Sequence, residues 1–112
     1  MSFQIRELLL DDGRSPFAEW FESLDAVPAA KVRVAVSRIE LGNVSNVEWF
    51  RGIGEYKIDW GPGLRIYLAK DGLKIIILLG GGTKKRQQQD IDRALALWES
   101  FKRRKASAQR GR

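Results

Sequence analysis

The spacing of hydrophobic positions changes twice along the chain, and each change marks a different kind of secondary structure. Residues 3–8 alternate apolar and polar side chains, as a half-buried strand does, and turn-forming residues follow at 11–13. Over residues 14–42 the apolar positions instead recur every three to four residues, which is typical of helices with one buried face. A Ser-Pro pair begins this segment and Gly42 ends it, so it predicts a helical hairpin.

From Val47 the period is two, and strands are predicted again. Polar and apolar side chains alternate over residues 55–60 and 64–68. The Gly-Pro-Gly sequence at 61–63 is a tight reversal, so these two strands are expected to be adjacent and antiparallel. Residues 73–79 are almost all apolar, which is typical of a central strand covered on both sides.

A last helix is predicted after the glycines at 80–82, which are expected to break the preceding strand. Its apolar stripe consists of Ile91, Ala94, Leu95, Trp98 and Phe101. The predicted order is therefore β-α-α-β-β-β-α. This order indicates an α+β fold, in which a small, curved, mostly antiparallel sheet carries an N-terminal helical hairpin and a C-terminal helix on one face.

The length of 112 residues suits one domain, expected at residues 1–104, with a basic and disordered tail at 105–112. The chain contains no cysteine and no histidine, which excludes disulfides, thiolate zinc sites and histidine catalysis. We therefore expect no metal and no cofactor. The longest apolar run, residues 75–79, is too short to cross a bilayer, and no secretory signal is visible, so we expect a cytoplasmic protein without a membrane contact.

The positive charge is concentrated at one end of the chain. The formal net charge is +6, but residues 1–83 carry 10 basic and 11 acidic side chains, whereas residues 84–112 carry 10 basic and 3 acidic ones. Such one-sided charge favours an anionic partner, either nucleic acid or an acidic protein. A solvated basic tail without a partner is an equally simple interpretation.

Four polar side chains are expected to converge on the sheet face opposite the predicted core. Alternation places Arg65 and Tyr67 on one side of their strand, and Glu55 and Lys57 on one side of the neighbouring strand. Two cations can bind a phosphate, and the planar guanidinium of arginine can donate two hydrogen bonds to it at once. Ordinary cross-strand charge pairing would produce the same pattern.

Residues 80–86 form a second candidate anion site. Glycines with accessible amides run into a helix start that carries Lys84 and Lys85, and both features can bind a phosphate. The spacing is not that of a phosphate-binding NTPase loop, and a flexible link between strand and helix explains the same residues.

Three linked segments of the chain resemble the RelE/ParE toxin superfamily, and within it the HigB-like addiction module killer proteins. They are GEYKI at 54–58, GPGLRIY at 61–67 and LLGGGTKKRQQQDI at 78–91. The resemblance extends over residues 3–104. Two positions depart from the family pattern, because Thr83 stands where aspartate is usual and Lys57 where arginine is common.

This resemblance implies a RelE-like fold and the toxin of a type II toxin–antitoxin pair. Such toxins cut mRNA without a metal, generally in the ribosomal A site. It also implies two kinds of partner: the ribosome with its mRNA, and an antitoxin that in the HigB branch is typically a small helix-turn-helix protein, HigA-like. The family's basic strand residue, hairpin arginine, hairpin tyrosine and turn lysine correspond to Lys57, Arg65, Tyr67 and Lys84.

The chemistry of RNA is consistent with such a site, because RNA carries its own nucleophile, the 2′-hydroxyl. The enzyme needs only to align the attack, stabilise charge and move protons, and cleavage would leave a cyclic phosphate. We expect Arg65 to bind the scissile phosphate, and Lys57 and Lys84 to share its charge. One of these lysines or Glu55 is the candidate base, and Tyr67 is expected to stack on a nucleobase or assist the leaving oxygen.

Further cations are candidate contacts to RNA or the ribosome, and such binding should weaken steeply with salt. They are Lys85, Arg86, Lys102, Arg103, Arg104 and Lys105. The C-terminal ones could equally pair with an acidic segment of the antitoxin. Two other functions share the fold and stay open: a ParE-like protein that inhibits DNA gyrase by contact without catalysis, and a catalytically inactive RNA-binding relative.

Overall fold

Five strands, three α-helices and one short 3₁₀ helix make up an α+β fold in the computed structural model, which describes residues 1–110. In chain order the elements are β1 (Gln4–Glu7), α1 (Pro16–Glu22), α2 (Ala26–Glu40), β2 (Val47–Phe50), β3 (Ile53–Ile58), β4 (Leu64–Asp71), β5 (Ile75–Thr83), the 3₁₀ helix η1 (Lys84–Arg86) and α3 (Gln87–Arg110). Within residues 1–110, none of the helices combines the length and the apolar character needed to span a bilayer.

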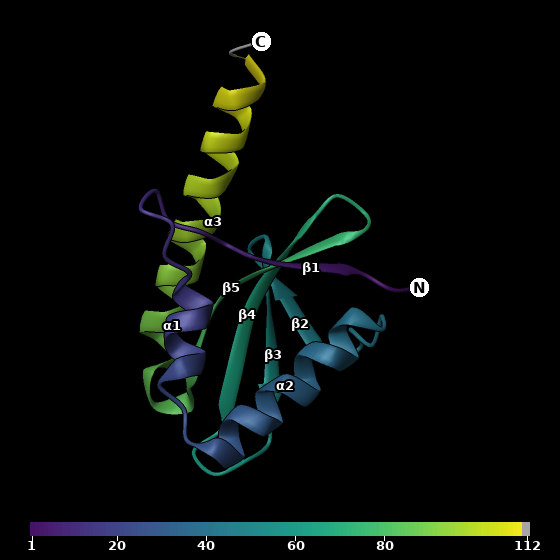
Figure 1. The fold of residues 1–112 in the computed structure, drawn as a ribbon, viewed down its shortest axis with the longest axis vertical. Coiled ribbons are helices and arrows are strands. Elements are labelled where there is room, and N and C mark those ends of the chain that lie inside the picture. Colours follow the sequence, from purple (N-terminus) through teal and green to yellow (C-terminus); the bar gives the residue numbers. More distant parts are fainter. Residues whose placement is uncertain (111–112) are drawn as a thin grey trace.

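The strands form one sheet in the order β1-β5-β4-β3-β2 (Figure 1). β1 is parallel to β5, and the other three neighbouring pairs are antiparallel. The mostly antiparallel sheet expected from the hairpin turns is therefore confirmed. β3 and β4, the two strands that carry the candidate site residues, lie in the interior of the sheet and are covered from both faces.

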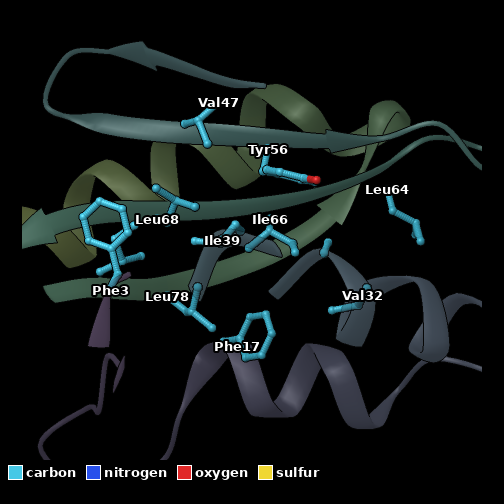
Figure 2. Close-up of a cluster of buried hydrophobic side chains, with 12 residues drawn as sticks. Phe3, Phe17, Val32, Ile39, Val47, Tyr56, Leu64, Ile66, Leu68 and Leu78 are labelled. Carbon is cyan, nitrogen blue, oxygen red and sulfur yellow. The ribbon is translucent and has the colours of Figure 1, made fainter. Parts of the chain in front are cut away.

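Helices pack on both faces of this sheet, which corrects the expectation of helices on one face only. α1 and α2 pack on the face that carries Ile66 and Leu68 (Figure 2). Because side chains alternate along β4, Tyr67 points to the opposite face, where it shares a second core with Ala94 and Trp98 of α3. The apolar stripe of α3 thus finds its partner on the face that was expected to be open to solvent.

The structure contains one strand more than the predicted order, because residues 47–58 fold into a hairpin of two strands. Arg51 and Gly52 form its two-residue turn, with φ angles of 53° and 88°. Positive φ at both turn positions matches the right-handed twist of paired strands. Arginine rarely adopts this conformation, and asparagine or aspartate is usual at its position in such a turn. The local sequence therefore does not indicate a turn between β2 and β3.

The glycines at 80–82 do not end the preceding strand, because β5 continues to Thr83. The pairing of β4 with β5 slips by one residue between Tyr67 and Leu68, which is the signature of a β-bulge. The glycine segment therefore belongs to the β4–β5 ladder. The flexible link and the phosphate-binding loop considered from the sequence are both replaced by a bulged strand.

Two of these glycines lie directly against side chains of the helices. A Cβ on Gly81 would overlap the ring of Trp20 in α1, and a Cβ on Gly82 would overlap the carboxylate of Asp90 in α3. The two neighbours lie on opposite faces of β5, because consecutive strand residues point in opposite directions. The absence of side chains here lets one helix approach the strand from each side.

The last helix, α3, is longer than expected, because it continues to Arg110 and extends past the sheet (Figure 1). Residues 105–110, predicted to be a disordered tail, are helical, and the rest of that predicted tail, residues 111–112, lies outside the described part of the chain. The ammonium of Lys105 lies 2.5 Å from the carboxylate of Asp71 at the end of β4. This contact, made beyond the predicted domain end, extends the ordered domain into the basic segment.

Candidate functional site

The four polar side chains predicted to converge do meet, on the sheet face beneath the start of α3. β3 and β4 pair with Lys57 opposite Arg65 and with Glu55 opposite Tyr67. The convergence expected from alternation is confirmed, because a two-residue side-chain period and an antiparallel register place these four positions side by side. These four residues together with Lys84 are called the hairpin cluster below.

The carboxylate of Glu55 is the centre of the hairpin cluster. The hydroxyl of Tyr67 donates to Glu55 Oε2 at 3.0 Å, and the side-chain amide of Gln87 lies 2.9 Å from Oε2 and 3.2 Å from Oε1. Two cations flank the carboxylate: Arg65 Nε lies 3.5 Å from Oε2, and Lys57 Nζ lies 3.9 Å from Oε1. A charge that would be costly to bury alone is therefore held by hydrogen bonds and ion pairs.

Three members of the hairpin cluster are buried, which corrects the expectation of an open catalytic surface. Glu55, Arg65 and Tyr67 are 1%, 6% and 1% exposed, whereas the side chain of Lys57 is 53% exposed. The reason is tertiary: α3 begins over this face, and its Gln87 closes over Glu55. An incoming ligand meets Lys57 and the rim of the cluster first.

The hydroxyl of Tyr67 is a protonated hydrogen-bond donor. Burial raises the pKa of Tyr67 above its ordinary value of 10, and the negative charge of Glu55 raises that pKa further. The ring packs in the core beneath α3. It is therefore not available to stack on a nucleobase, contrary to one of the roles expected for it.

Arg65 is held from two sides but keeps unused donors. Its Nη1 donates to the carbonyl oxygen of Gly63 at 3.2 Å, and its Nε faces Glu55. Nε is buried and has no hydrogen-bond partner among the described residues. Because guanidinium has five N–H donors, and among the described residues only Nη1 makes a hydrogen bond, Arg65 retains capacity to bind an anion.

A groove of about 610 Å³ opens beside Arg65, next to the Gly-Pro-Gly turn between β3 and β4. Lys57, Arg65 and Lys84 all line it, together with a single carboxylate, that of Asp59. Lys84 reaches the groove because its backbone N–H donates to the carbonyl of Gly63 at 3.0 Å, which holds the end of β5 against the turn. This excess of positive charge favours an anionic group such as a phosphate.

Cross-strand charge pairing, the simpler interpretation of the pattern, is present as well. Lys57 Nζ lies 3.6 Å from the carboxylate of Glu48 on β2, in addition to its contact with Glu55. An ion pair between half-exposed side chains contributes at most about 1 kcal/mol to stability. Stability alone therefore gives little reason for Lys57, whereas its place on the wall of the groove gives a chemical one.

Within residues 1–110, no group of three or more acidic residues is arranged to hold a metal ion.

The remaining cations expected to contact RNA fall into two separate groups. Lys85 and Arg86 are exposed in η1, directly after Lys84. The run at 102–105 begins about 22 Å farther along α3 than Gln87, at 1.5 Å per residue.

Three of the four side chains in the distant run are paired within the protein: Lys102 with Glu99, Arg104 with Asp11, and Lys105 with Asp71. Arg104 also donates to the carbonyl oxygen of Leu9 at 3.1 Å. Arg103 is exposed. Arg104 and Lys105 therefore attach α3 to the rest of the fold, and the structure does not bring the run together with the hairpin cluster.

Gln87 and Asp90 also belong to the site, although their positions in the sequence do not indicate a role. Both lie in the first turn of α3, three residues apart and therefore on one side of the helix. Gln87 contacts Glu55, and Asp90 faces Gly82 of β5. Their three-residue spacing at a helix start was the available signal, but nothing in a run of three glutamines distinguishes the one that faces the sheet.

Asp90 makes the stability of the fold depend on pH. Burial raises the pKa of Asp90 above its ordinary value of 3.8, although Arg86 and Arg93 act in the opposite direction. Over the window from 3.8 to the raised native pKa, the native state holds a proton that the unfolded chain has released. Stability therefore falls as the pH rises through this window.

We expect Asp90→Asn to remove this part of the pH dependence and to make the protein more stable above the window. Urea unfolding of both chains across the acidic range measures the effect. The same slope of unfolding free energy against pH in both chains would show that Asp90 is not the responsible group.

The chain has a relative among known proteins. No family model matches the chain, and no solved structure matches it significantly. The chain is 34% identical over 99 residues to an uncharacterized protein of Haemophilus influenzae (strain ATCC 51907 / DSM 11121 / KW20 / Rd), and this match covers 87% of the chain and 94% of the relative. At this identity and coverage, the chain belongs to the same family as the Haemophilus influenzae protein.

Proposed function

We propose that the protein is a RelE/HigB-like toxin of a type II toxin–antitoxin pair, which inhibits translation by metal-independent cleavage of mRNA on the ribosome. The observation that carries this proposal is the groove in which Lys57, Arg65 and Lys84 meet beside the hydrogen-bonded pair of Glu55 and Tyr67. The resemblance to the family assigns four of these positions to the site: Lys57, Arg65, Tyr67 and Lys84.

The order of elements supports the family assignment. A helical hairpin precedes the run of antiparallel strands, and a long helix follows it. We propose that this is the RelE-like arrangement, with β2 and β3 as the two halves of the strand segment predicted from residue 47.

Charge stabilisation is the largest contribution that this groove can make to RNA cleavage. The 2′-oxygen forms a bond to phosphorus while the bond from phosphorus to the 5′-oxygen breaks, and the phosphate oxygens gain negative charge on the way. Arg65, Lys57 and Lys84 are placed to receive that charge. The proton of the 2′-hydroxyl passes to a base, and the leaving 5′-oxygen takes up a proton.

We assign the base to one of the two lysines that line the groove, acting in its neutral form, while the other stays cationic and can supply the proton that the 5′-oxygen takes up. Glu55 was a candidate, but its carboxylate is enclosed by Tyr67 and Gln87. We assign Glu55 to holding Arg65, because their side chains lie 3.5 Å apart in a buried pair. Lys57 and Lys84 are exposed and can reach the substrate.

A second groove, of about 470 Å³, supports a protein partner. It lies between α2 and β3, and Lys57 lines both grooves. Lys31 and Arg38 border it, and Val34 beside them is 50% exposed. Such a surface suits an acidic and partly apolar segment, and we propose a helix-turn-helix, HigA-like antitoxin as the partner. Action on translation would place the protein in the cytoplasm.

The test is RNA cleavage by the purified chain. We expect defined cuts in mRNA on translating ribosomes, detected by primer extension, at the magnesium concentration that translation requires. Cleavage should weaken as salt increases, because phosphate contacts release counterions. Intact mRNA under all these conditions would remove the nuclease assignment.

The burial of Glu55, Arg65 and Tyr67 also suits a second candidate, a ParE-like inhibitor of DNA gyrase that acts by contact and performs no chemistry. Inhibition of gyrase supercoiling by the purified chain, together with intact mRNA, would support this alternative. RNA binding without cleavage and without growth arrest would support an inactive relative.

A further inference from the structure

Gln87 is the one residue of α3 that hydrogen-bonds directly into the buried part of the hairpin cluster. Its side-chain amide donates to both oxygens of Glu55, at 2.9 and 3.2 Å. The two residues are 32 positions apart in the sequence, so this contact fixes the start of α3 relative to β3. The neighbouring Gln88 bonds instead to Asp92 on the exposed side of the same helix.

Through Glu55 this contact reaches Arg65. Glu55 Oε2 accepts from Gln87 and lies 3.5 Å from Arg65 Nε. Apart from Glu55, the guanidinium is held by a single hydrogen bond, from Nη1 to the carbonyl of Gly63. The ion pair between Nε and Glu55 is the second contact that orients the guanidinium, so its position depends on where the carboxylate stands.

We propose that Gln87 is a positioning residue, which holds the guanidinium of Arg65 at the groove by fixing the carboxylate of Glu55. The inference rests on the proposed function only in that the anion bound by Arg65 is the phosphate of RNA. It assigns to the first turn of α3 the task of orienting the cation that lies beneath it.

The matched pair of variants is Gln87→Met and Gln88→Met. Methionine keeps the length of the side chain and removes the amide donors, and the two positions share a helix turn and lose the same group. We expect Gln87→Met to lower kcat for RNA cleavage by about 10- to 100-fold with little change in KM, because misplacing a catalytic group by about 1 Å costs this much. Gln88→Met is expected to cleave like the unsubstituted chain.

Two readouts do not depend on cleavage. The first is the ¹⁵N–¹H signal of Arg65 Nε, which is buried and should shift in Gln87→Met but not in Gln88→Met. The second is the dissociation constant for inorganic phosphate, followed by NMR, which should rise about tenfold in Gln87→Met. If the unsubstituted chain does not cleave RNA but both readouts are as expected, the proposed function is wrong and the positioning role of Gln87 still holds.

If Gln87 served only to stabilise the fold, a variant that restores stability would also restore phosphate affinity. In the exchange variant Glu55→Gln with Gln87→Glu, an amide and a carboxylate still face each other, so urea unfolding should recover relative to Gln87→Met. Phosphate affinity should not recover, because the group beside Arg65 Nε is then neutral. An unshifted Arg65 signal in folded Gln87→Met, or full recovery of phosphate affinity in the exchange variant, would overturn the proposal.

Discussion

Replacing Arg65 with methionine is expected to abolish RNA cleavage and the growth arrest that it causes. Arg65 is the buried one of the three cations that line the groove. Removal of a single preorganised donor to a developing oxyanion costs about 10²- to 10³-fold in kcat, and loss of a full charge should cost at least as much. Arg65→Lys should restore little, because an ammonium lacks the planar fork of donors.

The same substitution is expected to weaken the fold. Removing one partner of a buried ion pair leaves the other charge uncompensated, which costs about 3–5 kcal/mol. Here the group left behind is the carboxylate of Glu55, whose side chain is 2% exposed and which keeps the half-exposed Lys57, at 3.9 Å, as a flanking cation, so the cost should lie at or below the lower end of this range. Lost activity in the single variant could therefore reflect unfolding as well as lost chemistry.

The double variant Arg65→Met with Glu55→Gln separates these two causes. Both charges are then replaced by neutral groups of similar size, a change that is often close to neutral for stability. We expect urea unfolding near that of the unsubstituted chain, and no cleavage. Arg6→Met, an exposed arginine on β1, removes the same charge far from the groove and should leave activity intact. Cleavage by a folded double variant would exclude Arg65 from the site.

Replacing Gly81 with alanine is expected to cost about 1–3 kcal/mol of unfolding free energy, the usual range for overpacking a core. The added Cβ would overlap the six-membered part of the Trp20 ring, which is rigid and cannot swing aside as the end of a flexible side chain could. The strand cannot retreat either, because α3 packs against its other face at Gly82.

A double-mutant cycle with Trp20→Leu checks the cause. Leucine removes the ring, so Gly81→Ala should cost little in that background, and the coupling between the two substitutions should be about 1 kcal/mol or more. Urea denaturation of the four chains measures it. Additive effects would mean that the cost of alanine at this position arises from the bulged strand and not from the helix packed against it.

Several parts of the fold could be predicted from local pattern alone. The apolar stripes of α2 and α3 and the alternation of β3 and β4 follow from side-chain periods, which the chain fulfils whatever surrounds it. The same alternation placed Lys57 opposite Arg65 and Glu55 opposite Tyr67, because a tight turn leaves an antiparallel hairpin little choice of register.

The local sequence pattern gave the wrong secondary structure where contacts with residues distant in the sequence set the local conformation. The turn at Arg51 requires a conformation that arginine seldom adopts, and it is held by the pairing of β2 with β3. Gly81 and Gly82 resembled a break, because the Trp20 and Asp90 side chains that they accommodate are distant in sequence.

Which side chains share a face of the hairpin follows from the order of residues, since side-chain direction in a strand is set by the backbone. The burial of this face, in contrast, follows from the way the helices pack on the sheet. Periodicity reports that α3 has an apolar stripe but not which surface the stripe covers, and here it covers the face that carries Glu55, Arg65 and Tyr67. Docking of α3 brought Gln87 onto Glu55 and left Lys57 at the edge, because packing depends on the shape of the assembled sheet and not on any local run of residues.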